Sequence, residues 1–348
     1  MNVSDFDFDL PHGLIAQAPT PERGTSKLLV LRKSTGEIEH AGIASLPELL
    51  REGDLLVIND TKVFPARLLG TRVPSGGAVE FLLLSNLDGG LWDALVHPGQ
   101  KLQPGSRVEF RSETHLLHGE ILERHFHGRR TLRLWTESST SVEEAIDALG
   151  HVPLPPYIKR QDEQRDKERY QTVYARERGS VAAPTAGLHF TPEILSALDR
   201  RGVECAAITL HVGYGTFQPV RVNQVEAHTL DAERFSISEV SAEAINNAKR
   251  AGRRVIAVGT TTTRALEAAA MAGHGLITPV SGRTDLFIYP GFKFRIVDAL
   301  LTNFHLPQSS LLMLVSALGG LEAVRAAYRE AVAREYRFYS YGDAMLIV

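Results

Sequence analysis

Short apolar runs alternate with capped helical segments over the second half of this chain, and this alternation restricts the possible folds more than any other feature. A helix over 193–201 has Thr191 as N-cap, Pro192 in its first turn and Gly202 at its end, and the run "VECAAITL" follows. The order then recurs as "SAEAINNAKRAG" with Ser241 as N-cap, "RRVIAVG" and "TTTTRALEAAAMAG". Such repeats are typical of a mostly parallel sheet with helices packed on it.

Residues 63 to 152 have a different pattern of hydrophobic and turn residues. Short alternating runs, among them "AVEFLLLSNL", "SRVEFR" and "RRTLRLWTE", are separated by turn signals such as "PSGG", "DGG" and "QPGS". This spacing, roughly ten residues, indicates a β-barrel or sandwich. Because the buried-strand run "DLLVIND" precedes it, we predict an α/β protein: a mostly parallel α/β domain, residues 1–62 plus 153–348, with an inserted small β-barrel domain, residues 63–152.

Composition restricts the class of protein. Of 348 residues, 43% are hydrophobic and 23% charged, which is typical of a globular chain, and a single cysteine, Cys205, excludes a disulfide framework. No apolar stretch approaches the roughly 20 residues that cross a bilayer, and the acidic N-terminus has no positively charged leader. We therefore expect a cytoplasmic protein with no membrane partner. A monomer is expected as well, although composition does not determine the oligomeric state.

Basic residues gather in one segment although the net charge is −3. Residues 157–179 carry tyrosines and the cations Lys159, Arg160, Arg165, Lys167 and Arg169, interleaved with acids. One interpretation is a solvated charged surface. The other is a nucleic-acid-binding segment, with cations for phosphates and tyrosines for unstacked bases, and a second candidate surface is the barrel around Arg129, Arg130 and Arg133.

The residues best suited to bind a ligand or take part in a reaction lie at the ends of the predicted strands, because ligands of α/β proteins bind beyond the carboxyl ends of strands. After "VIAVG", Thr260 and Thr261 open a helix whose free N–H groups would attract an anion, although a simple threonine cap explains the pattern equally well. The stretch "AAPTAGLHFTPEIL" places Thr185, Gly187 and His189 beside another helix start. The segment "VIAVGTTTTRALEA" lacks the lysine and the spacing of a Walker A loop, so it does not indicate an NTPase.

Two further histidines follow strand-like runs. His211 opens "HVGYGTF" with Tyr214, and His305 follows Asn303 in "LLTNFHLPQ". The histidine spacings match no zinc motif, so we expect no metal site, and the absence of GxSxG argues against a serine hydrolase. A lone histidine at a strand end is usually structural, but several at one sheet edge favour an active site.

The motifs of this chain resemble those of a known family. "GSVAAPTAGLHFT", "TLHVGYGTFQPV", "AVGTTTTRALEA", "GRTDLFIYPGFKF", "LLTNFHLPQSSLLMLVSALGG", "YRFYSYGDAML", "VINDTKVFPARL" and "GHVPLPPYIKR" are similar to the signature segments of the S-adenosylmethionine:tRNA ribosyltransferase-isomerases of queuosine biosynthesis, the QueA family. The resemblance runs from Asp9 to Leu346. Where the family usually reads HxMHxE, this chain has "HTLDAERF", so that Leu230 and Asp231 replace Met and His.

The resemblance implies a reaction. The ribosyl part of S-adenosylmethionine would be transferred and isomerised onto 7-aminomethyl-7-deazaguanine at the wobble position of a tRNA, with epoxyqueuosine-tRNA, adenine and methionine as products. S-adenosylmethionine is then a substrate, and no bound cofactor or metal is implied. The implied fold, an α/β domain with an inserted β-barrel, agrees with the two patterns of hydrophobic and turn residues described above.

The chemistry suggests residue roles. A sulfonium acidifies the adjacent ribose hydrogens, so a base can form an ylide; adenine departure then needs an acid, and histidine can serve either role near neutral pH. The candidate catalytic residues are His189, His211, His228 and His305. The candidate substrate-binding residues are Asp60, Thr185, Gly187, Tyr214, Thr260, Thr261, Arg264, Asp285 and Asn303.

The residues alone do not exclude two other functions. A tRNA-binding module without activity would need the basic segment but not the histidines at strand ends. A methyltransferase would also use S-adenosylmethionine, but no glycine-rich loop follows a first strand.

Overall fold

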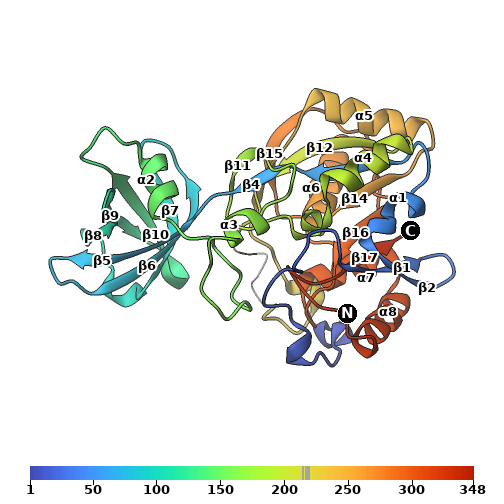
Figure 1. Cartoon of the computed structure of the whole chain (residues 1–348), viewed down its shortest axis with the longest axis horizontal. Coiled ribbons are helices and arrows are strands. Elements are labelled where there is room, and N and C mark those ends of the chain that lie inside the picture. Colours follow the sequence, from blue (N-terminus) through green and yellow to red (C-terminus); the bar gives the residue numbers. More distant parts are fainter. Residues whose placement is uncertain (214, 216–219) are drawn as a thin grey trace.

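The computed structural model describes residues 1–213, 215 and 220–348, which form two bodies (Figure 1). The larger body is a nine-stranded sheet with helices on both faces, and the smaller is a closed barrel. The chain leaves the sheet through β4 (Thr61–Val63), and β11 (Glu177–Ser180) pairs with β4 in parallel on the return. A two-stranded sheet therefore links the two bodies.

The large sheet has the strand order β15-β13-β12-β3-β14-β16-β17-β1-β2. Its centre, β12-β3-β14-β16, is parallel, whereas β13 and β15 on one side and β17 on the other run antiparallel to their inner neighbours. β1 is parallel to β17, and β2 is antiparallel to β1. The strands are β1 Lys27–Arg32, β2 Glu37–Gly42, β3 Leu55–Asn59, β12 Glu204–Leu210, β13 Glu233–Ile237, β14 Val255–Val258, β15 Val280–Thr284, β16 Ala299–Asn303 and β17 Ala344–Ile347.

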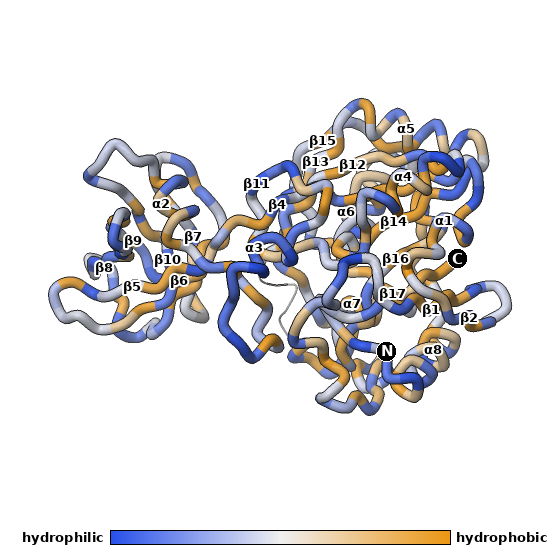
Figure 2. The backbone as a smooth tube through the Cα atoms, in the orientation of Figure 1, coloured by the Kyte–Doolittle hydropathy of each residue, from blue (hydrophilic) through white to orange (hydrophobic). Residues whose placement is uncertain are grey.

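Helices cover both faces of this sheet, because alternate strand residues point to opposite sides. α5, α6, α7 and α8 pack on the face that includes Val57 and Ala257, and α1, α4 and the 3-10 turn η6 pack on the face that includes Leu56 and Ile256. Figure 2 shows the hydrophobic central strands between these layers. The helices are α1 Leu46–Leu49, α2 Val142–Leu149, α3 Asp166–Arg169, α4 Pro192–Arg200, α5 Glu239–Arg250, α6 Thr260–Ala272, α7 Ser310–Gly319 and α8 Leu321–Ala333, with 3-10 turns η1 Val3–Phe6, η2 His12–Leu14, η3 Ile43–Ser45, η4 Gly99–Lys101, η5 Phe126–Gly128, η6 Thr185–His189 and η8 Val225–Ala227.

The barrel closes through six antiparallel strands in the order β10-β7-β6-β5-β8-β9. Leu68, Phe81 and Phe110 point inward and are fully buried, and α2 adds Ile146 to the same core after a capping box at Ser141. Closure removes the unpaired edges that an open sheet of this size would expose. The strands are β5 Arg67–Val73, β6 Ala78–Asn86, β7 Leu91–His97, β8 Arg107–Arg111, β9 Leu116–Arg124 and β10 Arg129–Trp135.

The sequence-based fold is confirmed in its class and in its inserted barrel. The sheet is parallel across its four central strands and between β1 and β17, whereas its other neighbouring strands pair antiparallel. Helix α5 begins at Glu239 with Ser238 as N-cap, not at Ser241, because the hydroxyl that accepts a helical N–H bond is that of Ser238. The domain boundaries at 63 and 152 stay a prediction.

Helices α7 and α8 follow each other directly in the chain, and α7 is almost entirely apolar. No single helix in the described ranges is long and apolar enough to cross a membrane, and α7 with α8 reaches that length only as a pair bent by 115°. Both helices contribute to the main core, for example through Met313 and Val324.

Glu267 connects the α6 layer to the strand that carries the predicted site residue Asn303. Its carboxylate is fully buried in α6 and accepts three backbone N–H bonds, from Arg295 at 2.8 Å, Ile296 at 3.0 Å and Val297 at 2.9 Å. These residues lead into β16. The position of β16 therefore depends on one buried carboxylate.

We expect Glu267→Ala to lower the free energy of unfolding by about 3 kcal/mol, because it leaves three buried donors without an acceptor. Glu267→Gln should cost less, since one oxygen remains for Ile296 and Val297. Denaturant unfolding monitored by circular dichroism measures both effects, with the exposed Glu322→Ala as control. An unfolding midpoint of Glu267→Ala equal to that of the control would contradict this role.

Candidate active site

The carboxyl ends of the four parallel strands meet at one edge of the large sheet. In sheet order these ends are Leu210 of β12, Asn59 of β3, Val258 of β14 and Asn303 of β16. Two cavities lie at this edge, and they share Val212 and Leu311 in their walls. We call them the inner pocket and the outer cleft.

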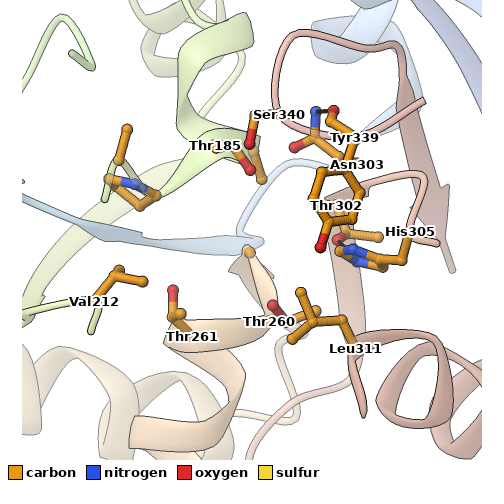
Figure 3. Close-up of a pocket in the computed structure, with 14 residues that line it drawn as sticks. Thr185, Val212, Thr260, Thr261, Thr302, Asn303, His305, Leu311, Tyr339 and Ser340 are labelled. Carbon is orange, nitrogen blue, oxygen red and sulfur yellow. Dashed lines mark hydrogen bonds between the residues drawn. The ribbon is translucent and has the colours of Figure 1, made fainter. Parts of the chain in front are cut away.

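The inner pocket lies between η6, the first turn of α6, the end of β16 and the loop before β17 (Figure 3). Its volume is about 40 Å³, enough for a group the size of a few water molecules. Five residues predicted from the sequence line it: Thr185, Thr260, Thr261, Asn303 and His305. Thr302, Tyr339 and Ser340 line it as well and were not predicted.

The outer cleft is larger, about 440 Å³, and lies between the barrel and the sheet. On the sheet side His211, Glu233 and Arg264 line it. The barrel wall includes Asp93, His125, Phe126 and Arg129. Phe126 is 88% exposed there, which is unusual for a large aromatic side chain.

The first turn of α6 presents unpaired donors to the inner pocket. Gly259 is the N-cap with φ +92°, a conformation that other residues rarely adopt, and no side chain caps this helix. The hydroxyls of Thr262 and Thr263 bond to the carbonyls of Val258 and Gly259. In the described part of the chain the N–H groups of residues 260–262 have no partner, so no threonine side chain caps this helix, and anion binding at its start stays a prediction.

Asn303 sits at the end of β16 with only 2% of its surface exposed. Its amide nitrogen donates to the Tyr339 carbonyl at 3.0 Å and to His189 Nε2 at 3.2 Å. The His189 ring then has its proton on Nδ1, which donates to Ser26 Oγ at 2.9 Å. Burial lowers the pKa of His189 to about 4, with help from the charges of Arg337 and Arg23, so the ring is neutral.

His305 is the second buried ring at this edge. Its Nε2 lies 3.0 Å from Thr302 Oγ1, and burial lowers its pKa to about 3. The Tyr328 hydroxyl accepts its backbone N–H. The ring lines the inner pocket in its neutral form.

His211 reaches the outer cleft from the end of β12. Its Nδ1 lies 2.8 Å from Thr61 Oγ1, and its Nε2 makes no hydrogen bond within the described residues. Burial lowers its pKa, with a contribution from Arg234. Gly179 packs against the ring: a Cβ there would lie 2.8 Å from Cε1, so only glycine leaves room for the imidazole.

Arg264 and Glu233 form a buried ion pair beside His211. Arg264 Nη1 donates to Glu233 Oε2 at 2.6 Å, and Gly213 N donates to Glu233 Oε1 at 2.8 Å. Arg264 Nε donates to the Leu286 carbonyl. The pair thus fastens the loop after β12 to helix α6, and the Arg264 guanidinium is largely occupied by protein.

Five predicted catalytic or substrate-binding residues lie outside both cavities: His189, which contacts the pocket residue Asn303, and the four that follow. Asp60 accepts from Thr209 and Arg176, and burial raises its pKa. Gly187 packs against Tyr174, whose hydroxyl would lie 2.2 Å from a Cβ there. His228 is half-buried against Phe287, and Asp285 is exposed after β15. Tyr214 falls outside the described residues.

The position that departs from the family pattern lies in the outer cleft. Asp231 lines the sheet side, and Arg129 lines the barrel side. The pKa of Arg129 is raised by its hydrogen bonds to Asp93 and, to a smaller extent, by the charge of Asp231. A carboxylate at position 231 therefore faces a barrel cation.

The basic segment divides into cations anchored on buried or backbone groups and cations exposed to solvent, of which Arg165 pairs with Glu163 at 2.8 Å. Arg160 pairs with both oxygens of buried Asp166, and Arg169 donates to the carbonyls of Thr20 and Pro21. Lys159, Arg165 and Lys167 are exposed around α3, in the hydrophilic stretch of Figure 2. On the barrel, Arg130 is buried against carbonyls and Arg133 pairs with Glu120.

The residues that sequence reasoning missed share a cause. Ser340 and Tyr339 come from a loop near the C-terminus, and Asp93 and Phe126 come from strands and turns of the barrel. The segment "YRFYSYGDAML" carried a signal for the first two, since its serine, tyrosines and glycine are unusual for a simple strand connection. No such signal marks the barrel residues. Within the described ranges no three His, Cys, Asp or Glu side chains are arranged to hold a metal ion.

Comparisons with known proteins cover the whole chain. The family model of the queuosine biosynthesis proteins matches residues 3–347. Relatives from Symbiobacterium thermophilum and Desulfitobacterium hafniense are 53% and 51% identical over 348 residues, with full coverage of both chains, and each is named S-adenosylmethionine:tRNA ribosyltransferase-isomerase. The crystal structure of the S-adenosylmethionine tRNA ribosyltransferase from Thermotoga maritima is similar with a TM-score of 0.56 and 38% identity, over 99% of this chain and 100% of that one.

The two neutral buried histidines predict how stability depends on pH. The folded rings take up protons only near pH 4 and pH 3, whereas unfolded histidine does so near 6.5, so unfolding binds protons between these values. We expect stability to fall as the pH is lowered from 6.5 towards 4, by about 1.4 kcal/mol per pH unit for each ring.

Urea unfolding at pH 7.5, 6 and 5 measures this slope. His189→Gln and His305→Gln should each make it shallower than in the wild type. The exposed His12→Gln serves as control and should leave it unchanged. Equal slopes in wild type and both buried-site variants would show that these rings do not cause the pH dependence.

Proposed function

The chain belongs to the family of queuosine biosynthesis proteins, and on this premise we propose that it transfers and isomerises the ribosyl moiety of S-adenosylmethionine onto 7-aminomethyl-7-deazaguanine at the wobble position of tRNA. The products are epoxyqueuosine-tRNA, adenine and methionine. The observation that carries the proposal is the pair of joined cavities at the carboxyl edge of the sheet, one small and one open to the barrel.

His211 suits the role of the proton-transfer group. Its Nε2 makes no hydrogen bond to the described residues while Thr61 holds Nδ1, so the ring is oriented with one nitrogen available. The lowered pKa keeps that nitrogen unprotonated at neutral pH, which a base needs to remove a proton from the ribose carbon next to the sulfonium. The proton can then pass to the departing adenine.

The other three histidines suit different roles. Both ring nitrogens of His189 bond to protein side chains, so we propose that His189 positions Asn303 and exchanges no proton with substrate. His305 lines the inner pocket as a neutral group. His228 lies outside both cavities, and its Nε2 is buried without a partner among the described residues.

The tRNA is proposed to approach the outer cleft. An anticodon loop presents unstacked bases and closely spaced phosphates. Phe126 offers an exposed ring for stacking, and Arg129, Arg234 and Arg283 line the same cleft. Lys159, Arg165 and Lys167 would extend this contact along α3. That the protein acts as a cytoplasmic monomer without a bound cofactor or membrane partner stays a prediction.

One incubation tests this function against the two alternatives. Protein, S-adenosylmethionine and tRNA carrying 7-aminomethyl-7-deazaguanine are combined, and the products are separated by chromatography. Free adenine together with the epoxyqueuosine nucleoside is the expected result. S-adenosylhomocysteine would indicate methyl transfer, and tRNA retention with no small product would indicate a binding module; either would overturn the proposal.

We expect His211→Ala to lower kcat/KM by about a hundredfold or more, the usual contribution of a general base. In the wild type, activity should decrease below pH 6.5 as the ring becomes protonated, and this acid limb should be missing from the variant. Rates of adenine release from pH 5 to 8 measure both effects. The exposed His274→Ala is the control. Wild-type rates in His211→Ala would remove this residue from the mechanism.

The exposed cations of the basic segment predict a change in tRNA binding. Replacing Lys159, Arg165 and Lys167 with Ala should weaken the affinity and reduce the slope of log Kd against log salt by about one unit per lost phosphate contact. A matched control replaces Arg200, Arg201 and Arg250, exposed cations before β12 and β14 at the opposite sheet edge. Equal salt slopes in the two triple variants would support a merely solvated segment.

A further inference from the structure

We propose that the inner pocket binds the amino-acid end of S-adenosylmethionine, with the Asn303 amide oxygen accepting a hydrogen bond from the α-ammonium and the first turn of α6 binding the α-carboxylate. This inference rests on the proposed function, because it assumes that S-adenosylmethionine is the substrate. It adds the orientation of that substrate: methionine inward, and adenosine towards the outer cleft.

The orientation of the Asn303 amide is fixed by its neighbours. The Tyr339 carbonyl can only accept, so the atom 3.0 Å from it is the amide nitrogen. The second proton of that nitrogen points to His189 Nε2. The amide oxygen is consequently turned the other way, towards the side chains of Thr185 and Ser340 in the inner pocket (Figure 3).

That oxygen has no hydrogen-bond partner among the described residues, although it is buried. An unpaired buried acceptor costs about 1–3 kcal/mol, and a ligand that donates to it recovers this cost. Asn303 is otherwise fully satisfied, and the Ser26–His189 chain holds it in place. The hydrogen bonds to Tyr339 and His189 therefore hold the Asn303 amide in an orientation that leaves its oxygen as an unpaired acceptor.

The opposite wall of the pocket presents hydrogen-bond donors, which complement the Asn303 acceptor. The N–H groups of residues 260–262 are unpaired in the described structure, and the positive end of the α6 dipole adds to them. Among the described residues no Asp, Glu, Lys or Arg side chain lines the inner pocket, and its one histidine, His305, is neutral. A group that carries both a positive and a negative charge fits such a site, with its anion on α6 and its cation on Asn303.

Size separates the amino-acid end from the nucleoside. The inner pocket holds about 40 Å³, which admits an ammonium and a carboxylate but not a purine with its ribose. The outer cleft of about 440 Å³ continues from it past Val212 and Leu311 and contains His211. Methionine in the inner pocket would therefore leave the sulfonium and ribose near the wall shared with the cleft.

The test compares ligands that differ at the amino-acid end. Isothermal titration gives Kd for S-adenosylmethionine, for 5′-methylthioadenosine, which lacks that end, and for the deaminated analogue of S-adenosylmethionine. In the wild type we expect the deaminated analogue to bind at least tenfold more weakly than S-adenosylmethionine, since a hydrogen bond to a charged group is lost.

Asn303→Leu should weaken S-adenosylmethionine binding at least tenfold and leave the Kd of 5′-methylthioadenosine within about twofold. Asn246→Leu is the matched control, because Asn246 clamps the backbone of Ile277 through both amide atoms and lies outside the pocket. Thermal unfolding of both variants checks folding. If Asn303→Leu does not fold, the wild-type ligand series still tests the proposal.

Two results would overturn the inference. Equal weakening of both ligands in Asn303→Leu would assign the amide to the adenosine part, and equal wild-type affinities for S-adenosylmethionine and its deaminated analogue would exclude an ammonium site. Failure of the proposed function looks different, because wild-type protein would then bind no S-adenosylmethionine or release no adenine from it.

Discussion

The four central strands of the sheet run parallel, and this common direction determines which residues lie at the edge that carries the candidate active site. Parallel neighbours need a crossover on each return, so β3, β12, β14 and β16 all end at the same edge. The residues just beyond these ends, including Thr61, His211, Thr260 and His305, are far apart in the chain and yet border two joined cavities or contact residues that do. A reversal of any one strand would remove its residues from the site.

Buried carboxylates hold the loops at this edge in position. Glu267 accepts three backbone N–H bonds before β16, and Glu233 joins the loop after β12 to Arg264 on α6. Asp343 accepts from the backbone of Lys27 and Arg337 and so fixes the loop that carries Tyr339 and Ser340. A carboxylate bonded to several amides loses hydrogen bonds when any one partner moves, so these bonds hold the loops in the observed positions.

The barrel adds the second wall of the outer cleft. It is joined to the sheet through β4 and β11 and carries its own core, so its contribution is a surface and not support for the sheet (Figure 1). Asp93 holds Arg129 on that wall, opposite Asp231. The substitution of the family's usual histidine by Asp231 therefore lies where the two bodies face each other, and its charge acts on the barrel side of the cleft.

Local patterns were sufficient to predict the α/β class, the inserted barrel, the helix start at Thr260 and the placement of His211 and Asn303 at strand ends, because periodicity and capping depend on residues close in sequence. The same patterns placed His189 and Arg264 at the site but could not tell that protein partners occupy them, since Ser26, Asn303 and Glu233 are remote in the chain. Ser340 had only the unusual composition of its segment as a signal, and Phe126 and the unpaired amide oxygen of Asn303 had none. Each depends on which distant segments the folded sheet and barrel bring together.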